Sequence, residues 1–536
     1  MMETSQDVYS EILYSTVKFR VTGTQLIFYA VIFLVLVLLI KIKLNTIRYE
    51  KFAAKISGPP AYPIIGSLLE FIRTPKELTK HLTEICETYG PEPFKIWFGC
   101  SLAVILTKPE DIQAILTSPN ALEKAYMYKC LKVGVGEGLV TAPVEKWKKQ
   151  RRMLTPAFCS DNMKKLFFPT VKEKTDILIK NLNKEVGNTQ PFNMLEYISD
   201  AVFSTLTQTT IGFNLDVVSK QGTDLKQSVL KAMQLVAVRA YSPWLYPEII
   251  YSIYCKFTGY ESVFKQLHTL PVYMIRKAKE QRKMGDKPVI VNDDNDSVEN
   301  KKKRLKVFLD ILLELREAGE NLTDEDIKYQ LATILSTGYE STTITVSFCL
   351  LLLAMHQDIQ DKVYDEIYSV FGDSDEECTI DNINKLVYLK QVFRETLRLF
   401  PPAPVILREL QSDVQIFSGN YMIPKGTTCI IAPMNTHHRP ELYPNHRSFN
   451  PDNFSPENIA KRHKYSFIPF SGGPRGCIGE KYATMNMTVI LATVVRNFSL
   501  HTDMKLSDVK LKIDLAARSA QGYPVTIRPR NRRKTT

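Results

Sequence analysis

An uncharged apolar segment near the start of the chain is the strongest constraint on its fold. Residues Val21–Ile40 carry no charge, and Leu26–Ile40 is an unbroken run of fifteen apolar residues. Because a helix rises about 1.5 Å per residue, twenty residues span about 30 Å, the thickness of a bilayer's hydrocarbon core. A buried core helix and a cleaved signal peptide are the alternatives. A polar leader and the absence of a small-residue cleavage site disfavour the signal peptide. The segment predicts an uncleaved transmembrane anchor.

Basic residues are distributed unevenly around this segment. Lys18 and Arg20 are the basic residues before it, whereas five follow within fifteen residues: Lys41, Lys43, Arg48, Lys51 and Lys55. Positive charge is retained on the cytoplasmic side of a membrane. With the anchor at residues 21–40, residues 1–20 are therefore expected in the lumen and the rest of the chain in the cytosol.

The composition predicts a large folded domain in a reducing compartment. The 536 residues are 44% hydrophobic and 24% charged, which excludes a disordered or collagen-like chain. Nine cysteines without a C-x-x-C pair argue against a disulfide framework or a zinc ribbon. The formal net charge of +12 is consistent with an anionic lipid surface or an acidic protein partner. We expect no nucleic-acid partner.

Prolines and polar runs divide the rest of the chain. Residues 41–66 are predicted to be a basic, proline-rich hinge, because three prolines within Gly58–Gly66 interrupt both helix and strand. The polar stretch Gly285–Arg304 predicts a solvated loop, and residues 528–536 predict a basic tail. Helical periodicity dominates the domain at residues 67–527, with short strand-like pieces at 94–106, 414–422 and 427–432. The predicted fold class is mainly α with minor β.

The stretch Phe470–Gly479 is the most specific local signal in the sequence. Four glycines and a proline in ten residues exclude a helix or an ordinary strand and predict a tightly turned loop. A helix is predicted over Glu480–Phe498, which places Cys477 just before a helix N-terminus. The unpaired amides there stabilise a thiolate. A lone cysteine is more often a small buried hydrophobe, but the surrounding glycines and Arg475 favour a ligand.

A second unusual segment lies within a long predicted helix. Thr323 and Asp326 have capping-box spacing, and the apolar period continues through Leu353. Residues 337–343 place a glycine, a carboxylate and hydroxyl groups where a core helix favours Leu or Ala. Hydroxyl groups can bond to the preceding turn's carbonyls and bend a helix, which predicts a loosened turn with room for a small ligand and water. The alternative is a kinked core helix whose polar residues are incidental.

Two weaker patterns involve charged residues. Glu395 and Arg398 lie at i and i+3 in a helix predicted over Lys390–Phe400, and such pairs are common and contribute little at a surface. Basic side chains also surround Trp147. They form either a solvated helix face or a docking surface for an acidic protein; they are Lys146, Lys148, Lys149 and Arg152.

The stretch Phe470–Gly479 matches, position for position, the F-x-x-G-x-R-x-C-x-G haem-binding signature of the cytochrome P450 family. The chain resembles this family over essentially its whole length. The resemblance implies the cytochrome P450 fold and a haem b that is bound without a covalent link. It further implies that Cys477 is the axial thiolate ligand, that Arg475 pairs with a haem propionate, and that Phe470 packs beside the sulfur. Gly473 and Gly479 are implied to be cofactor contacts.

The same resemblance assigns roles to the helix segment at residues 337–343. Gly338, Glu340 and Thr342 fit the family pattern A/G-G-x-D/E-T-T/S, while Ser341 replaces the usual threonine. Gly338 is then a cofactor contact. Glu340 is implied to gate protons toward the hydroxyl of Ser341, with Thr342 as the alternative hydroxyl.

Further charged residues also match family elements. Trp147 and Arg151 resemble a W-x-x-x-R element that binds one haem propionate, and Arg408 resembles an arginine that binds the other. Glu395 and Arg398 are implied to be a structural pair behind the haem. Asn453 stands where the family has a third arginine, and Arg447 is a candidate replacement.

These resemblances imply a haem-thiolate monooxygenase in the endoplasmic reticulum membrane that inserts one atom of O2 into a lipophilic small molecule. Electrons would come from NADPH through NADPH–cytochrome P450 reductase, with cytochrome b5 as a second candidate donor, and the basic residues around Trp147 would be the docking surface. A reductase-independent isomerase or dehydratase and a non-catalytic haem carrier are the alternatives. Glu340 and its hydroxyl neighbours disfavour both.

The substrate is the least determined part of this hypothesis. The chain looks most similar to the animal, particularly insect, branch related to family four, whose members oxidise fatty acids, hormones, pheromones or foreign compounds. In many of these a glutamate esterifies the haem, and Thr337 stands at that position, so no covalent attachment is expected. The predicted pocket-lining segments are residues 125–136, 241–247, 402–406 and 519–522.

Overall fold

The computed structural model describes residues 23–212, 220–283, 307–372 and 379–530. The chain divides into two compact units, Met1–Lys55 and Ile56–Thr536. The predicted lumenal segment at residues 1–20, the polar loop at 285–304 and residues 531–536 of the predicted tail lie outside the described residues.

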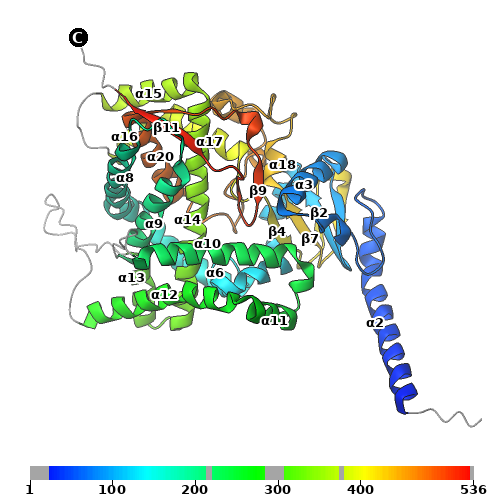
Figure 1. The fold of residues 1–536 in the computed structure, drawn as a ribbon. Helices are drawn as coiled ribbons and strands as arrows, with labels where there is room; N and C mark the ends of the chain where they lie inside the picture. Colours follow the sequence, from blue (N-terminus) through cyan, green and yellow to red (C-terminus); the bar gives the residue numbers. More distant parts are fainter. Residues whose placement is uncertain (1–22, 213–219, 284–306, 373–378, 531–536) are drawn as a thin grey trace, which may run out of the picture. The chain divides into compact units, whose positions relative to one another are not determined.

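A single helix, α2, makes up the described part of the first unit (Figure 1). It spans Gly23–Ala53 and is long and apolar enough to cross a membrane, and the side chains of its most apolar window are not buried. The helix continues beyond the predicted end of the anchor at Ile40. Helix-forming residues follow, and an ion pair between Lys43 and Glu50 at 2.7 Å supports them. Residues 41–53 of the predicted hinge are therefore helical.

Helices dominate the second unit, as the fold-class prediction requires (Figure 1). In chain order they are α3 (Pro75–Tyr89), α4 (Pro109–Thr117), α5 (Lys132–Val135), α6 (Val144–Leu154), α7 (Ser160–Asn162), α8 (Phe168–Leu182), α9 (Met194–Ile211), α10 (Lys220–Tyr241), α11 (Glu248–Thr258), α12 (Tyr260–Lys283), α13 (Phe308–Glu317), α14 (Asp324–Met355), α15 (Gln357–Phe371), α16 (Ile380–Lys385), α17 (Val387–Leu399), α18 (Pro433–His437), α19 (Pro456–Ala460) and α20 (Glu480–Asn497).

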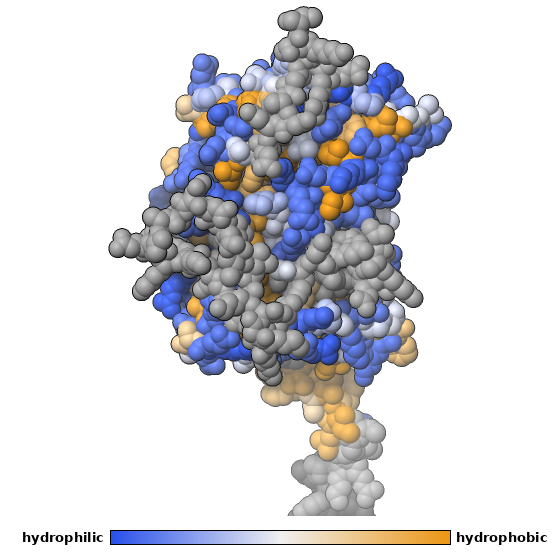
Figure 2. Space-filling model, turned by 90° about the vertical axis from the view of Figure 1, so that its left-hand side faces the viewer, coloured by the Kyte–Doolittle hydropathy of each residue, from blue (hydrophilic) through white to orange (hydrophobic). Residues whose placement is uncertain are grey.

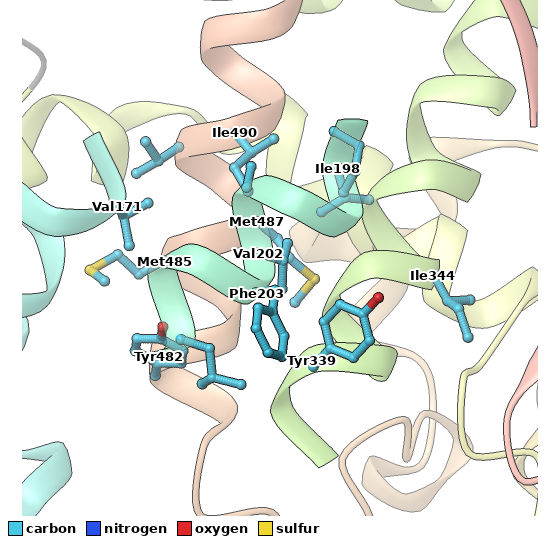
Figure 3. Packing of buried hydrophobic residues seen from close by; sticks show 14 of the residues in the cluster. Val171, Ile198, Val202, Phe203, Tyr339, Ile344, Tyr482, Met485, Met487 and Ile490 are labelled. Carbon is cyan, nitrogen blue, oxygen red and sulfur yellow. The ribbon is translucent and has the colours of Figure 1, made fainter. Parts of the chain in front are cut away.

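The long helix α14 runs through the core of this unit. Its predicted capping box is present, because the Thr323 hydroxyl accepts from the Asp326 amide at 3.0 Å and the Asp326 carboxylate accepts from the Thr323 amide at 3.1 Å. Helices α8, α9 and α20 complete the packed core (Figure 3). In it the rings of Phe203 and Tyr339 meet edge to face, with centroids 5.4 Å apart. Although α14 is apolar enough to span a membrane, most of it is buried in protein, so it is a core helix.

The minor sheet component of the described residues is divided among four small sheets. The largest has the order β1-β2-β7-β4, with β2 and β7 parallel and the other pairs antiparallel. The three predicted strand regions correspond to β1 with β2, β5 with β6, and β7. The strands are β1 (Phe94–Phe98), β2 (Ser101–Leu106), β3 (Phe192–Asn193), β4 (Ile406–Glu409), β5 (Val414–Gln415), β6 (Met422–Ile423), β7 (Thr428–Ile431), β8 (Phe498–His501), β9 (Leu511–Ile513), β10 (Ala517–Ser519) and β11 (Pro524–Pro529).

The proline-rich part of the predicted hinge is docked on the largest sheet. Tyr62 and Gly66 exchange backbone hydrogen bonds of 2.8–2.9 Å, and the Ser67 amide donates to the Trp97 carbonyl at 2.7 Å. Gly66 has φ +62°, and a Cβ there would lie 2.4 Å from the Trp97 carbonyl oxygen. Only glycine tolerates this approach. The proline-rich segment therefore lies within the second unit.

The predicted C-terminal tail also begins inside the fold. Strand β11 includes Arg528 and Pro529 and pairs with β8, and the Arg530 amide donates to the Asn497 carbonyl at 2.9 Å. These backbone bonds order the first three residues that we predicted to be a tail. On the face shown in Figure 2, hydrophilic side chains predominate among the coloured residues, and hydrophobic ones form small separate areas.

Candidate active site

The loop that carries Cys477 is closed by its own backbone. The Cys477 amide donates to the Phe470 carbonyl at 2.9 Å, and the Gly476 amide donates to the Gly473 carbonyl at 3.0 Å. Phe470 packs against the main core cluster, which anchors the first residue of the loop. The loop ends at Gly479, the N-cap of α20. The predicted loop before a helix N-terminus is thus present, and it fixes the direction of the Cys477 backbone.

Two glycines of this loop lie close to neighbouring segments of the chain. Gly473 has φ +65°, and a Cβ there would lie 1.9 Å from the Leu116 carbonyl oxygen at the end of α4. Its neighbour Gly472 is close to the ring of Tyr465, at 2.9 Å from an ideal Cβ. Gly473 therefore permits a close approach to α4, and its contact with the cofactor stays a prediction. At Gly479 a Cβ would be 4.0 Å from the Cys477 sulfur, which is ordinary contact.

Opposing effects act on the Cys477 thiol. Burial raises its pKa and is the largest effect; the Gly479 and Glu480 amides and the Arg151 guanidinium lower it, and the Glu480 carboxylate raises it. The side chain is nevertheless accessible by surface area. The sulfur is thus surrounded by many protein atoms but is not covered by them. Helix-end amides and a cation are the groups that favour a thiolate.

Helix α6 is attached directly to the cysteine loop through Arg151. Its Nη1 donates to the carbonyl of Gly476 at 2.7 Å, one residue before Cys477. The structure therefore places Arg151 beside the loop that carries the cysteine, whereas the resemblance implies a contact with a haem propionate. Trp147, one turn earlier on α6, is buried and points to a different neighbour.

That neighbour is Arg475, which joins a cluster of buried cations. Its guanidinium lies 4.2 Å from the centre of the Trp147 ring and donates to the carbonyls of Leu122 and Ala142 at 2.9 Å. Burial and the nearby Arg408 lower the pKa of Arg475 to about 10. Burial and the two arginines hold the pKa of Lys124 well below its ordinary value.

This cation cluster fits a group with two carboxylates. Arg408 is almost fully buried, and its Nη2 has no hydrogen-bond partner among the residues that the structure describes. Among the described carboxylates, Glu123 is the one that acts favourably on Arg475. Two buried arginines beside the partly buried Lys124, with so little counter-charge, are costly unless an anion joins them. The two propionates of haem would supply that charge. Lys124 was missed by the sequence analysis because no motif contains it.

The hydroxyl groups of α14 mostly bond to their own helix. The hydroxyls of Thr337 and Ser341 donate to the carbonyls of Thr333 and Thr337, each at 2.7 Å. The helix stays continuous from Asp324 to Met355, so the predicted loosened turn is absent from its backbone. Thr342 is buried. A Cβ at Gly338 would lie 3.2 Å from the Leu206 side chain, so this glycine permits close packing of α14 on α9.

Glu340 has an ionic partner that no sequence motif indicated. The Oε1 atom of Glu340 lies 2.5 Å from Nη2 of Arg518 on β10. Burial raises the pKa of Glu340, the Arg518 guanidinium lowers it and Asp514 raises it. The two partners are 178 residues apart, so spacing carried no signal for this pair.

The predicted pair behind the site is completely buried. Both Arg398 and Glu395 have fully covered side chains, joined by two hydrogen bonds of 2.7 Å. Asn453 fulfils the expectation of a neutral hydrogen bond, because its Nδ2 donates to Glu395 Oε1 at 3.1 Å. Arg447 does not replace the missing arginine: it is exposed and pairs with Glu87 at 3.1 Å.

Another arginine takes that position instead. The guanidinium of Arg462 lies 4.5 Å from the centre of the buried Tyr443 ring, and Arg398 lies 5.0 Å from the same ring. Arg462 also donates to the Asn453 carbonyl and acts electrostatically on Glu395. The chain thus keeps a second cation near Glu395, held by an aromatic ring between two arginines.

The basic residues around Trp147 differ in how far they are paired. Lys146 lies 2.9 Å from Asp326 and 3.4 Å from Glu137, and Lys148 lies 3.0 Å from the exposed Glu145. Lys149 and Arg152 are exposed on the same helix. Lys146 therefore tethers α6 to α14, and the basic surface is smaller than predicted, with Lys148, Lys149 and Arg152 as its members.

The predicted pocket segments are brought together by the fold. The rings of Tyr126 and Tyr246 meet with centroids 6.0 Å apart, which joins residues 125–136 to 241–247. The Tyr241 hydroxyl donates to the Asp514 carbonyl at 2.7 Å, and the Ala517 amide donates to the Pro402 carbonyl at 3.1 Å. The hairpin of β9 and β10 therefore contacts two of these segments.

Comparisons with known proteins agree with this architecture. The family model described as Cytochrome P450 matches residues 56–521. Cytochrome P450 4g15 of Drosophila melanogaster is 31% identical, with 91% of this chain and 94% of that protein aligned. Cytochrome P450 4V2 of Homo sapiens is 32% identical over 88% of this chain and 89% of its own length. Cytochrome P450 4c21 of Blattella germanica is 31% identical over 90% and 95%.

The chain belongs to the cytochrome P450 family, and within it resembles the family 4 members. It is accordingly an oxidoreductase of the monooxygenase class. The cofactor of this family is haem b with a cysteine thiolate as axial ligand. The predicted family, mainly α fold class, enzyme class and cofactor are confirmed.

Proposed function

We propose that Cys477 is the thiolate ligand of the haem iron and that this protein oxidises a lipophilic small molecule with O2. The observation that carries the proposal is the accessible Cys477 side chain, which lies beside the Gly479 and Glu480 amides and the cationic Arg151. Haem ligated by a thiolate supplies the activation of dioxygen. The chain's own residues then have to bind the cofactor, supply protons and receive electrons.

Binding of the cofactor is assigned to the cation cluster. Trp147, Arg408 and Arg475 would hold the haem propionates, and Lys124 is a fourth contact that the buried charge distribution favours. Arg151 would hold the cysteine loop in place through its hydrogen bond to the Gly476 carbonyl. Attachment without a covalent bond is supported by Thr337, which has no carboxyl group to esterify.

Proton supply is assigned to Glu340 with Ser341 or Thr342. Glu340 is the buried carboxylate nearest to these hydroxyls in the sequence of α14 and is joined to the rest of the fold by Arg518. The Ser341 hydroxyl donates to the Thr337 carbonyl, so its oxygen is left to accept a hydrogen bond from water. These groups favour a monooxygenase over a reductase-independent isomerase or dehydratase or a haem carrier, neither of which needs such a relay.

Electron delivery from NADPH is assigned to a membrane-bound reductase, NADPH–cytochrome P450 reductase, with cytochrome b5 as a second donor. The exposed cations of α6 support this, because α6 contacts the cysteine loop. Charge reversal of Lys148 and Lys149 to Glu should slow reduction by the reductase, more at low ionic strength than at high, since screening weakens long-range attraction. Stopped-flow reduction rates at two salt concentrations measure this, and a salt-independent effect would contradict a docking role.

A membrane location in the endoplasmic reticulum, with the second unit in the cytosol, is supported by two apolar surfaces. The first is α2. The second is one face of α11, which exposes Ile249, Ile250, Ile253 and Phe257 while Tyr251 and Cys255 on its other side are buried. An exposed apolar face of this kind favours a lipid surface. A substrate dissolved in the membrane, such as a fatty acid, hormone, pheromone or foreign compound, would suit this location.

The proposal is tested by a reduced, carbon monoxide difference spectrum of membranes that contain the full chain. The native protein should show the long-wavelength Soret band after which the family is named, and Cys477→Ala should lose it. Cys159→Ala is the matched control, because Cys159 is an exposed cysteine outside the site. Haem that binds with this band in Cys477→Ala would mean that another residue is the ligand.

A further inference from the structure

The partner of Glu340 comes from the C-terminal hairpin. Glu340 lies in the middle of α14, and Arg518 lies on β10, which pairs with β9 in a two-stranded sheet. Their side chains approach to 2.5 Å, and this contact joins the centre of the core helix to the hairpin. Arg518 has a second acidic neighbour, because its Nε lies 3.7 Å from Asp514 Oδ2. One guanidinium is therefore shared between two carboxylates.

The charges continue from this pair toward solvent. Lys512 Nζ lies 3.2 Å from Asp514 Oδ2, so the row runs from Glu340 through Arg518 and Asp514 to Lys512. The side chain of Glu340 is 6% exposed and that of Lys512 is 41% exposed, with Arg518 and Asp514 between these values at 21% and 11%. The hairpin thus carries a continuous row of charged groups from the surface to the α14 carboxylate.

The charged groups of this row have opposing effects on the pKa of Glu340. Burial raises the pKa of Glu340, Arg518 lowers it and Asp514 raises it again. The other titratable groups that face this pair are Tyr339 on α14 and Tyr523 just before β11, and burial raises the pKa of both. Asp200 of α9 acts on Tyr339 and is itself paired with Lys226. The hairpin therefore supplies the charges that most directly set the protonation of Glu340.

We propose that Arg518 is a positioning residue that orients Glu340 and keeps it ionised, and that Asp514 and Lys512 connect this pair to solvent. The C-terminal hairpin then controls the protons that Glu340 delivers. This inference rests on the proposed function of Glu340. Ionised Glu340 takes up a proton from water on the solvent side of the hairpin and passes it to the hydroxyls of α14, which returns Glu340 to its ionised form, while Arg518 stays protonated throughout.

If Arg518 only holds the hairpin to α14, its substitution should affect the pKa of Glu340 differently than if its charge sets that pKa. Arg518→Gln removes the favourable charge, so the pKa of Glu340 should rise by about 1 unit or more. Asp514→Asn removes the unfavourable charge and leaves Arg518 to Glu340 alone, so the pKa should fall. Arg518→Lys keeps the charge and should restore most of the native value. Loss of a clamp would not produce shifts of opposite sign.

The measurement is the infrared carboxyl band of Glu340 in the full-length protein, titrated with pH and assigned by its absence in Glu340→Gln. The pH profile of product formed per NADPH consumed is a second readout, and its acidic limb should move in the same direction as the infrared midpoint. Arg528→Gln, on an exposed arginine of β11, is the matched control and should shift neither. The inference is overturned if Arg518→Gln and Asp514→Asn shift the midpoint in the same direction or not at all.

The carbon monoxide difference spectrum distinguishes a failure of the proposed function from a failure of this inference alone. If the native chain shows no thiolate-haem band, the proposed function fails, whatever the infrared midpoints are. If the band is present and the midpoint of Glu340 is insensitive to Arg518, the inference about the hairpin fails alone. If Arg518→Gln does not fold, Arg518→Lys and Asp514→Asn still test the inference. An unchanged titration midpoint of Glu340 in Asp514→Asn would contradict an effect of Asp514 on Glu340.

Discussion

Two carboxylate–arginine pairs, each with a buried carboxylate, differ in how completely they are bonded. All five N–H groups of Arg398 are used: three go to the carbonyls of His437, His446 and Ser448, and two go to Glu395. Glu395 also accepts from the Asn450 amide and from Asn453. Glu340 and Arg518 are joined by one hydrogen bond, and Arg518 Nε is buried without a hydrogen-bond partner.

This difference separates a pair that holds the fold from a pair that is available for chemistry. In the first pair every N–H of Arg398 is used and both side chains are fully covered, and the two residues lie on consecutive turns of one helix. An incompletely bonded pair between distant segments can change its protonation or partners at lower cost. Buried polar networks are rigid when every member is satisfied, and we expect the two pairs to respond differently to mutation.

The largest expected effect is on the saturated pair. Arg398→Ala leaves the Glu395 carboxylate buried without its cation, and it should lower the free energy of unfolding by about 3–5 kcal/mol. Thermal unfolding and the yield of haem-containing protein measure this loss. Arg394→Ala is the matched control, because Arg394 is exposed on the same helix. A native-like melting temperature in Arg398→Ala would contradict the structural role of the pair.

The second effect is on the incompletely bonded pair and should appear in activity. Glu340→Gln keeps the size of the side chain and removes the transferable proton, so the rate of product formation should fall by about 100-fold. Thermal unfolding should change little, since Arg518 retains contact with Asp514. Product and NADPH consumption are measured together. Glu325→Gln, in the exposed first turn of α14, is the control. Unchanged activity in Glu340→Gln would contradict a role of Glu340 in proton transfer.

The smallest effect concerns the arginine that replaces the family's third one. Arg462→Ala should lower the free energy of unfolding by about 1–2 kcal/mol, because it removes a cation–π contact with the buried Tyr443 ring. Arg447→Ala should change it by less than about 0.5 kcal/mol, since exposed ion pairs contribute little. Urea unfolding of both variants makes the comparison, and equal losses would contradict the assignment of Arg462.

Much of the fold followed from local patterns. The capping box of Thr323 and Asp326 and the proline stop after Leu399 placed the ends of α14 and α17. Helix α17 begins earlier than predicted, at Val387, because the Glu366 carboxylate accepts from the amides of Tyr388 and Leu389 at 2.6 and 2.9 Å. This cap comes from another helix, so no pattern near Val387 could indicate it.

Only the part of the candidate site whose residues are close together in the sequence was predicted. The glycine loop, Cys477 and the start of α20 are close in sequence, and the structure has them together. Lys124, Arg462 and Arg518 belong to no local pattern and were found only when distant segments met. The close approach of Gly473 to Leu116 could not be predicted, because Leu116 lies on α4, far away in the sequence.

By itself the sequence determined the features that depend on neighbouring residues: an apolar run long enough to span a bilayer, helix caps, and a cysteine beside a helix N-terminus. Local backbone geometry decides these, and it acts within a few residues. The tertiary structure decided which charges face each buried carboxylate. An ion pair between Glu340 and Arg518 exists because burial brings together groups 178 residues apart, and burial is a property of the packed core rather than of any segment.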